Sequence, residues 1–206
     1  MPHHRRFART AVTLAALSLL PALALAETKG HSAEVGIAYT FTHFDTQTDL
    51  EYRLSPSIMA GYNFTKRHGA EVVFNSTTAT PRKGDPLKVD VDVLRIGYVF
   101  NAQSKPKIVS FFRLGLGIWS IDPEPSPNPP PRLEEGDTSP MIYTGGGFRF
   151  FMTERLAIRV AGSFDYIDAG NGLAHGDVQA TADLGFTFTM GGREPVEAPP
   201  SEPAKP

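Results

Sequence analysis

The 206-residue chain has no cysteine, which excludes a disulfide framework, a thiolate metal site and a lipoprotein anchor. Its 20 Lys and Arg are balanced by 22 Asp and Glu, so it has no basic footprint for nucleic acid, and no nucleic-acid partner is expected. Hydrophobic residues make up 41% of the chain, a low share for a helical membrane protein. The 19 glycines and 18 prolines favour many turns over long helices.

The first 26 residues have the pattern of a secretory signal peptide. A basic start, residues 3–9, precedes an apolar run over residues 11–25. Ala24 and Ala26 are the small residues at the two positions that a signal peptidase reads. An uncleaved membrane anchor is the alternative, but the run is shorter than the ~20 residues of a spanning helix, and Pro21 interrupts it. We expect cleavage after Ala26.

The rest of the sequence alternates between apolar and small or polar residues, with the period of a β-strand. Eight segments show this pattern, at residues 34–42, 52–64, 69–79, 87–100, 107–121, 145–151, 156–166 and 178–188. Each is roughly as long as a tilted strand must be to cross a bilayer. In the fourth, the phase slips at Val93 and Leu94, which predicts either a bulge or a strand that leaves the membrane there.

The connections between these segments alternate in length, as in a barrel with long outer loops and short inner turns. We predict outer loops at 45–51, 80–86, 122–138 and 167–176, and inner turns at Thr65 to His68, Asn101 to Pro106 and Met152 to Glu154. Aromatic residues close to the inner turns fit a girdle at the membrane surface: Phe64, Phe100, Phe150 and Phe188. The prediction is an all-β fold, an eight-stranded antiparallel transmembrane up-and-down β-barrel over residues 27–190.

A soluble, lipocalin-like barrel would also alternate, but its outer face would carry Lys, Glu and Gln. Here the non-apolar face is mostly Gly, Ala, Ser and Thr with isolated charges of both signs, which suits a narrow lumen. The charges expected in the lumen are Glu71, Arg95, Arg113, Arg149, Arg159, Asp165 and Asp183. These charges fit either a gated pore or a permanently plugged lumen that paired charges stabilise. The interior of an eight-stranded barrel is narrow enough for side chains to fill it, which favours the plugged lumen.

Three segments resemble the outer-membrane β-barrel domain shared by OmpA-, OmpX- and OmpW-like proteins: Gly36–Phe44, Phe112–Ile121 and Gly145–Val160. Phe148 to Val160 match that family's pattern of a strand ending in aromatics, a Thr/Asp-x-Arg-Leu turn and an apolar strand. The resemblance implies that the barrel-assembly machinery reads a signal in the last strand during insertion, formed by Asp183, Gly185, Phe188 and Met190. Met190 departs from the family's usual aromatic residue.

Residues 191–206 form a proline-rich tail, which we expect to be an extended periplasmic segment. It resembles the linker that follows the barrel in OmpA-type proteins, but a cell-wall tether through a peptidoglycan-binding domain is not expected. The expected partners are outer-membrane lipid and lipopolysaccharide, and the expected state is a monomer.

No catalytic, cofactor or metal site is expected. A lipid A deacylase of this architecture requires a His-x-Ser-Asn arrangement, and neither His43 nor His175 is followed by that serine. Acidic residues that could bind a divalent cation or lipopolysaccharide-bound ions are read as solvated: Asp90, Asp92, Glu134, Glu135 and Asp137. The leading hypothesis is a structural or surface-interaction barrel. The alternatives are a narrow passive transporter for small or hydrophobic solutes and, more remotely, a lipid-modifying enzyme.

Overall fold

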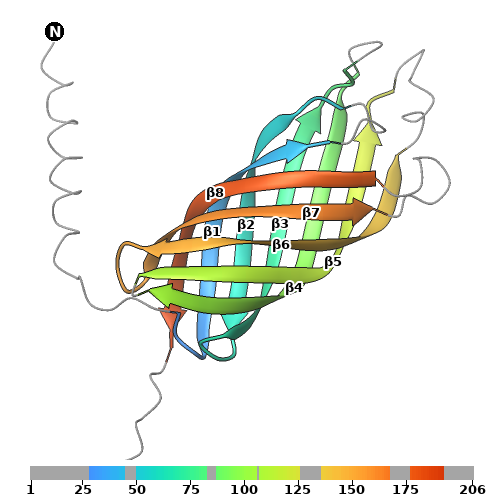
Figure 1. Ribbon diagram of the computed structural model, residues 1–206. Coiled ribbons are helices and arrows are strands. Elements are labelled where there is room, and N and C mark those ends of the chain that lie inside the picture. The colour runs from blue at the N-terminus through green and yellow to red at the C-terminus, as the bar shows by residue number, and fades with distance from the viewer. Residues whose placement is uncertain are drawn as a thin grey trace, which may run out of the picture.

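A computed structural model describes residues 28–44, 50–82, 87–105, 107–125, 136–167 and 177–192. These residues form eight strands: β1 (Ser32–His43), β2 (Arg53–Asn63), β3 (His68–Ala79), β4 (Val89–Lys105), β5 (Ile108–Pro123), β6 (Asp137–Phe151), β7 (Leu156–Ile167) and β8 (Asp177–Gly191). Each strand pairs antiparallel with its neighbours, and β1 pairs with β8, so the sheet closes into a barrel (Figure 1). The predicted fold class is confirmed. The described ranges contain no helix long and apolar enough to cross a membrane.

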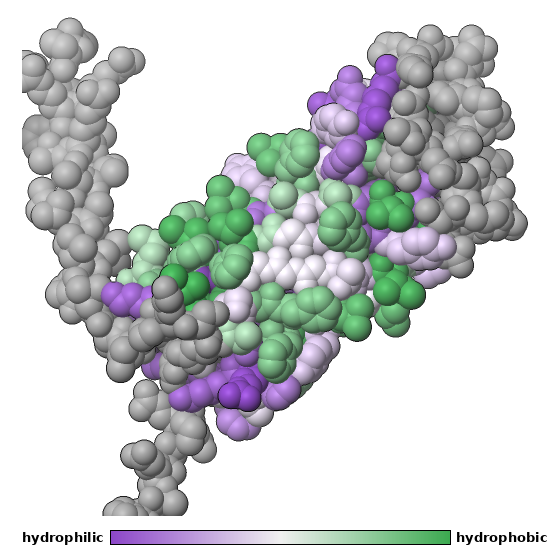
Figure 2. All heavy atoms as spheres, in the orientation of Figure 1, coloured by the Kyte–Doolittle hydropathy of each residue, from purple (hydrophilic) through white to green (hydrophobic). Residues whose placement is uncertain are grey.

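The alternation along the strands separates an apolar outer face from the interior. On β5, Leu114 and Leu116 are 49% and 66% exposed, whereas Arg113 just before them and Trp119 farther along are each 1% exposed. The space-filling view in Figure 2 shows hydrophobic side chains over the strands and hydrophilic ones toward the two ends. An apolar outer face contradicts a soluble barrel and suits a barrel surrounded by lipid.

The short connections lie at one end of the barrel, at residues 64–67, 106–107 and 152–155. We call this the short-turn end; β1 begins and β8 ends there, at the lower left of Figure 1. In two of these turns a threonine hydroxyl fixes the reversal. Thr65 Oγ1 accepts the backbone N–H groups of Arg67 and His68, and Thr153 Oγ1 accepts those of Arg155 and Leu156. The longer connections lie at the opposite end, the long-loop end.

The phase slip at Val93 and Leu94 is not a bulge. β4 pairs residue by residue with β3 from Phe100 to Val89, and its pairing with β5 is equally regular there. Val89, Val91 and Val93 point inward and are buried, while Asp90 and Asp92 point outward. The pattern inverts because the outer face is no longer apolar at this height, as expected for a strand that has left the membrane.

The predicted turn at Asn101 to Pro106 is also wrong, because β4 continues to Lys105. Asn101 pairs with Phe111 in the sheet, and its side chain is held in the interior by Asn63 and Arg149. The register shifts only beyond this point, between Gln103 and Lys105. Interior hydrogen bonds therefore extend the strand through residues whose types favour a turn.

The expected signal peptide with its cleavage residues Ala24 and Ala26 lies outside the described residues, and so does the tail beyond Gly192.

Candidate functional site: the barrel interior

The centre of the interior is organised around one carboxylate, Glu71 on β3. It accepts hydrogen bonds from Arg159 on β7, at 2.8 Å, and from Arg113 on β5, at 3.3 Å. Arg113 also donates to Asp183 on β8 at 2.8 Å. Thr40 adds a hydrogen bond of 2.8 Å to the same Asp183 carboxylate. Two arginines and two carboxylates thus form one connected network across the lumen.

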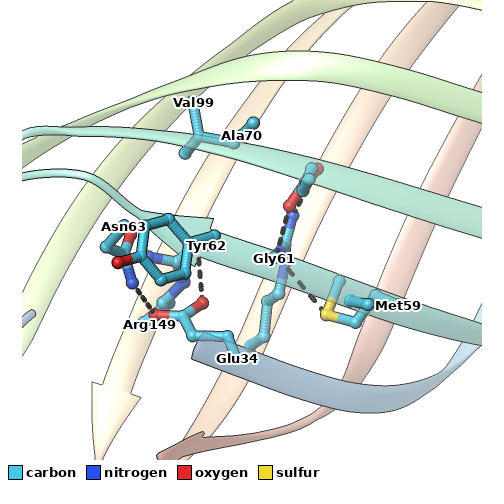
Figure 3. Close-up of a pocket in the computed structure, with 11 residues that line it drawn as sticks. Glu34, Met59, Gly61, Tyr62, Asn63, Ala70, Val99 and Arg149 are labelled. Carbon is cyan, nitrogen blue, oxygen red and sulfur yellow. Dashed lines mark hydrogen bonds and ion pairs between the residues drawn. The ribbon is translucent and has the colours of Figure 1, made fainter. Parts of the chain in front are cut away.

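A second group of polar side chains lies nearer the short-turn end. Arg149 on β6 pairs with Glu34 on β1 at 3.2 Å and donates to Asn101 at 2.9 Å. Asn63 donates to the other oxygen of Glu34 at 2.9 Å. Figure 3 shows Arg149, Glu34 and Asn63 pointing toward one another. The ring of Phe111 lies beneath the arginines of both groups, 4.8 Å from the guanidinium carbon of Arg149 and 4.3 Å from that of Arg159, so cation–π contact supplements the ion pairs.

On the other side of Glu71, toward the long-loop end, Arg95 on β4 pairs with Asp165 on β7. Tyr143 lies fully buried in the interior. Its ring fits against β4 and β5 because Gly97 and Gly115 have no side chain. A Cβ at Gly97 would meet the tyrosine hydroxyl and the Leu114 carbonyl, and one at Gly115 would meet the tyrosine ring and the Ile96 carbonyl.

All seven charges expected in the lumen are buried, with exposed fractions of 7% or less. Each of the five ion pairs they form crosses the lumen, because none joins neighbouring strands. The eighth member, Glu34, was missing from the predicted set, although its place on the inward face of the first segment could have revealed it. With Glu34, four arginines face four carboxylates, so the network is neutral.

The interior is different at the long-loop end, where a cluster of buried apolar side chains fills it. Its members are Phe44, Leu50, Ala79, Leu87, Val89, Val91, Val93, Trp119, Ile121, Met141 and Ile167. The segments beside the barrel join this cluster: Leu50 bridges to Pro81, and Glu51 donates its backbone N–H to Thr80. We call the buried apolar residues of this cluster the apolar plug.

Little space is left between the side chains of the charged region. A cavity beside Glu34, Glu71, Arg149 and Arg159 has a volume of about 10 Å³, which is room for about one water molecule. Filled in this way, this part of the interior can brace the wall of the barrel.

The sequence matches the model of the family described as "Outer membrane protein beta-barrel domain" over residues 12–189. The chain belongs to this family. Membership and fold together indicate an outer-membrane location. No curated protein matches the chain in sequence.

Solved structures of other outer-membrane barrels share the fold of this barrel domain. OprG from Pseudomonas aeruginosa matches with a TM-score of 0.57 and 11% identity, covering 80% of this chain and 98% of OprG. Neisserial surface protein A matches with a TM-score of 0.56 and 12% identity over 77% and 96% of the two chains. The N-terminal β-barrel domain of Pseudomonas aeruginosa OprF matches with a TM-score of 0.50 and 18% identity over 78% and 99%. At these identities the likeness shows the fold alone.

The four residues of the expected assembly signal are divided between the inner and the outer face of β8. Asp183 belongs to the interior network, and a Cβ at Gly185 would collide with Ile37 and Ala38 of β1. Phe188 and Met190 point outward and are 41% and 43% exposed. Their recognition by an assembly machinery stays a prediction.

Of the residues considered for metal binding or catalysis, the structure describes Asp90, Asp92, Asp137 and His43. Within the described ranges, no three His, Asp or Glu side chains are arranged to hold a metal ion. Asp90 accepts a hydrogen bond from Thr78 at 2.6 Å, and Asp137 accepts one from Ser139 at 3.0 Å. His43 packs its ring against Tyr52. Glu134, Glu135 and His175 lie outside the described residues.

Proposed function

We propose that this protein is a structural outer-membrane barrel that is closed to solutes and presents its long loops as an interaction surface. The observation that carries the proposal is the double filling of the interior. A neutral network of eight charged side chains occupies the middle, and the apolar plug occupies the long-loop end. Eight strands enclose only enough room for side chains, and here the side chains use that room.

The orientation we propose places the short turns in the periplasm and the long loops outside the cell. Short periplasmic turns and longer extracellular loops are general in bacterial outer-membrane barrels. The expected signal peptide over residues 1–26 would export the chain, and the barrel-assembly machinery would insert it. Outer-membrane lipid and lipopolysaccharide would then surround a monomer. Fractionation of cells tests the location, and recovery in the soluble periplasm would contradict it.

Conductance of the refolded protein in a planar lipid bilayer tests the closed lumen. We expect no channel openings at any voltage, because an ion would have to separate buried ion pairs to pass. Regular openings would overturn the proposal and support a narrow transporter. An enzymatic role is tested separately by the mass of lipid A after overexpression, which we expect to be unchanged.

A further inference from the structure

The described residues that precede β1, Thr28–His31, form a strap across the short-turn end of the barrel. Thr28 is only 3% exposed and Gly30 is also buried, so the strap is packed against the barrel. Thr28 lines a space of about 410 Å³ together with Asn101 and Val109 of β4 and β5. Because β5 lies opposite β1 in the closed barrel, the strap crosses the mouth of the lumen before it enters β1.

The strap lies directly against the end of the last strand. Ser32, the first residue of β1, pairs with Gly191, the last residue of β8, so the strap continues from the point where the barrel closes (Figure 1). Gly192 follows with a φ of 97°, a conformation that favours glycine. A Cβ added there would lie 2.6 Å from the Cβ of Lys29. The strap and the end of β8 therefore fit together only because residue 192 has no side chain.

An ion pair joins the strap to a hairpin beyond β8. Lys29 Nζ lies 3.3 Å from Glu154 Oε2, in the turn between β6 and β7. The two residues are 125 positions apart in the sequence, and β8 separates β1 from β7 in the barrel. Both side chains are partly shielded from water, with 24% and 45% of their surface exposed. The pair thus connects the start of β1 to β7 across the end of β8.

The backbone of the strap is held in an unfavourable conformation. His31 has a φ of 55°, in the left-handed region that residues with a side chain rarely adopt. The Ser32 hydroxyl donates a hydrogen bond of 2.6 Å to the Lys29 carbonyl and closes the reversal. Gly30 packs on the turn between β2 and β3, where an added Cβ would lie 3.4 Å from the Cα of Thr65. Such a conformation persists only where the surrounding contacts stabilise it.

The contacts of the strap depend on the closed state of the barrel. Lys29 touches Gly192 and pairs with Glu154, and both partners take these places only when β8 lies between β1 and β7. The contacts therefore form after β8 has paired with β1. An interaction that forms after the transition state of folding slows unfolding and leaves the folding rate nearly unchanged. The strap thus acts on the reopening of the barrel and not on its closure.

We propose that the strap stabilises the closed seam between β1 and β8 and slows its reopening from the short-turn end. Lys29 is the central residue, because its side chain packs on the end of β8 and its charge pairs with Glu154. The seam is the one place where the first and the last strand of the chain meet. This inference does not depend on whether the lumen conducts or on what the long loops bind.

The experiment measures hydrogen exchange of backbone amides by mass spectrometry, with the full chain refolded in lipid vesicles. In the double variant Lys29→Gln/Glu154→Gln we expect exchange at residues 32–35 and 188–191, the short-turn end of the seam, to be roughly threefold faster, as suits one partly exposed ion pair. In Gly192→Ala we expect it to be roughly tenfold faster, because the new side chain is strained at this φ and collides with Lys29. Exchange where β4 pairs with β5 is expected to stay unchanged in both variants.

The matched control is Lys88→Gln/Glu124→Gln, which removes a lysine–glutamate pair of 3.8 Å at the long-loop end. It changes the same residue types and should leave exchange at the seam as in the parent protein. Unchanged exchange at the seam in Lys29→Gln/Glu154→Gln would overturn the proposal. An equal rise along β4 and β5 would also overturn it, because the strap would then stabilise the whole barrel and not the seam. Heat-modifiable migration on a gel verifies that each variant is folded, and the double variant keeps the test valid if Gly192→Ala does not fold.

Discussion

The two halves of the barrel interior are built in opposite ways. In the middle, the outer face is apolar and the inner face carries arginines and carboxylates. At the long-loop end the inner face carries the apolar plug, and acidic residues such as Asp90 and Asp92 point outward. The difference follows from the surroundings, because a wall that faces lipid leaves only the interior for polar groups, whereas a wall that faces water can bury its apolar groups as a soluble protein does. The inversion along β4 therefore marks where the strand leaves the membrane.

The largest effect expected from this comparison is in the charged region. Glu71→Ala removes the carboxylate that Arg113 and Arg159 share. Two buried cations lose a partner, so we expect the free energy of unfolding to fall by about 3–5 kcal/mol. Urea titration of the barrel in lipid vesicles, followed by the fluorescence of Trp119, measures it.

The control for this substitution is Glu124→Gln, which breaks an exposed pair with Lys88 at 3.8 Å. It is expected to change the free energy of unfolding by less than about 0.5 kcal/mol. If Glu71→Ala were as mild as this control, the network would contribute nothing to stability, and the contrast between the two halves of the interior would fail.

An intermediate effect is expected in the apolar plug. Ile121→Ala leaves a cavity among buried side chains, so we expect a loss of about 2–3 kcal/mol in the free energy of unfolding. The neighbouring Asp122 is exposed, and Asp122→Asn is expected to be neutral within about 0.5 kcal/mol. Identical unfolding curves for these two variants would show that the long-loop end is not packed like a soluble core.

The smallest effect is expected for Thr40, an uncharged side chain within the charged region. Thr40→Val preserves the shape of the side chain but removes the hydroxyl that bonds Ser57 and Asp183. We expect a loss of about 1–2 kcal/mol, since a hydrogen bond to a buried carboxylate is removed. The same substitution at Thr138, whose hydroxyl bonds Ser120 on the exposed surface, is expected to have little effect. Equal losses at the two threonines would mean that burial adds nothing to this hydrogen bond.

The fold was predictable from the sequence because lipid constrains every second residue of a strand. The same rule assigned Arg113 to the interior, where it is buried. It did not foresee the extension of β4 past Asn101, because the residue types there favour a turn and only contacts with Asn63 and Arg149 hold the strand.

The partners within the network could not be predicted. Which arginine meets which carboxylate depends on the stagger of strands that are not neighbours, and no local pattern encodes it. Glu34 and Phe111 lie on the inward face, and their contacts with Arg149 follow only from the closed barrel. The site was thus predictable as a set of inward residues and not as a set of contacts.

The paths of the ion pairs have a consequence for how the barrel assembles. Since no pair lies within a hairpin, a hairpin that enters the membrane alone carries arginines or carboxylates with no partner on its own two strands. The electrostatic stabilisation arrives only when strands that are not neighbours face each other across the lumen, and for Asp183 on β8 this requires the last strand. Until then, a partly assembled barrel keeps the inner charges that lack a partner in contact with water.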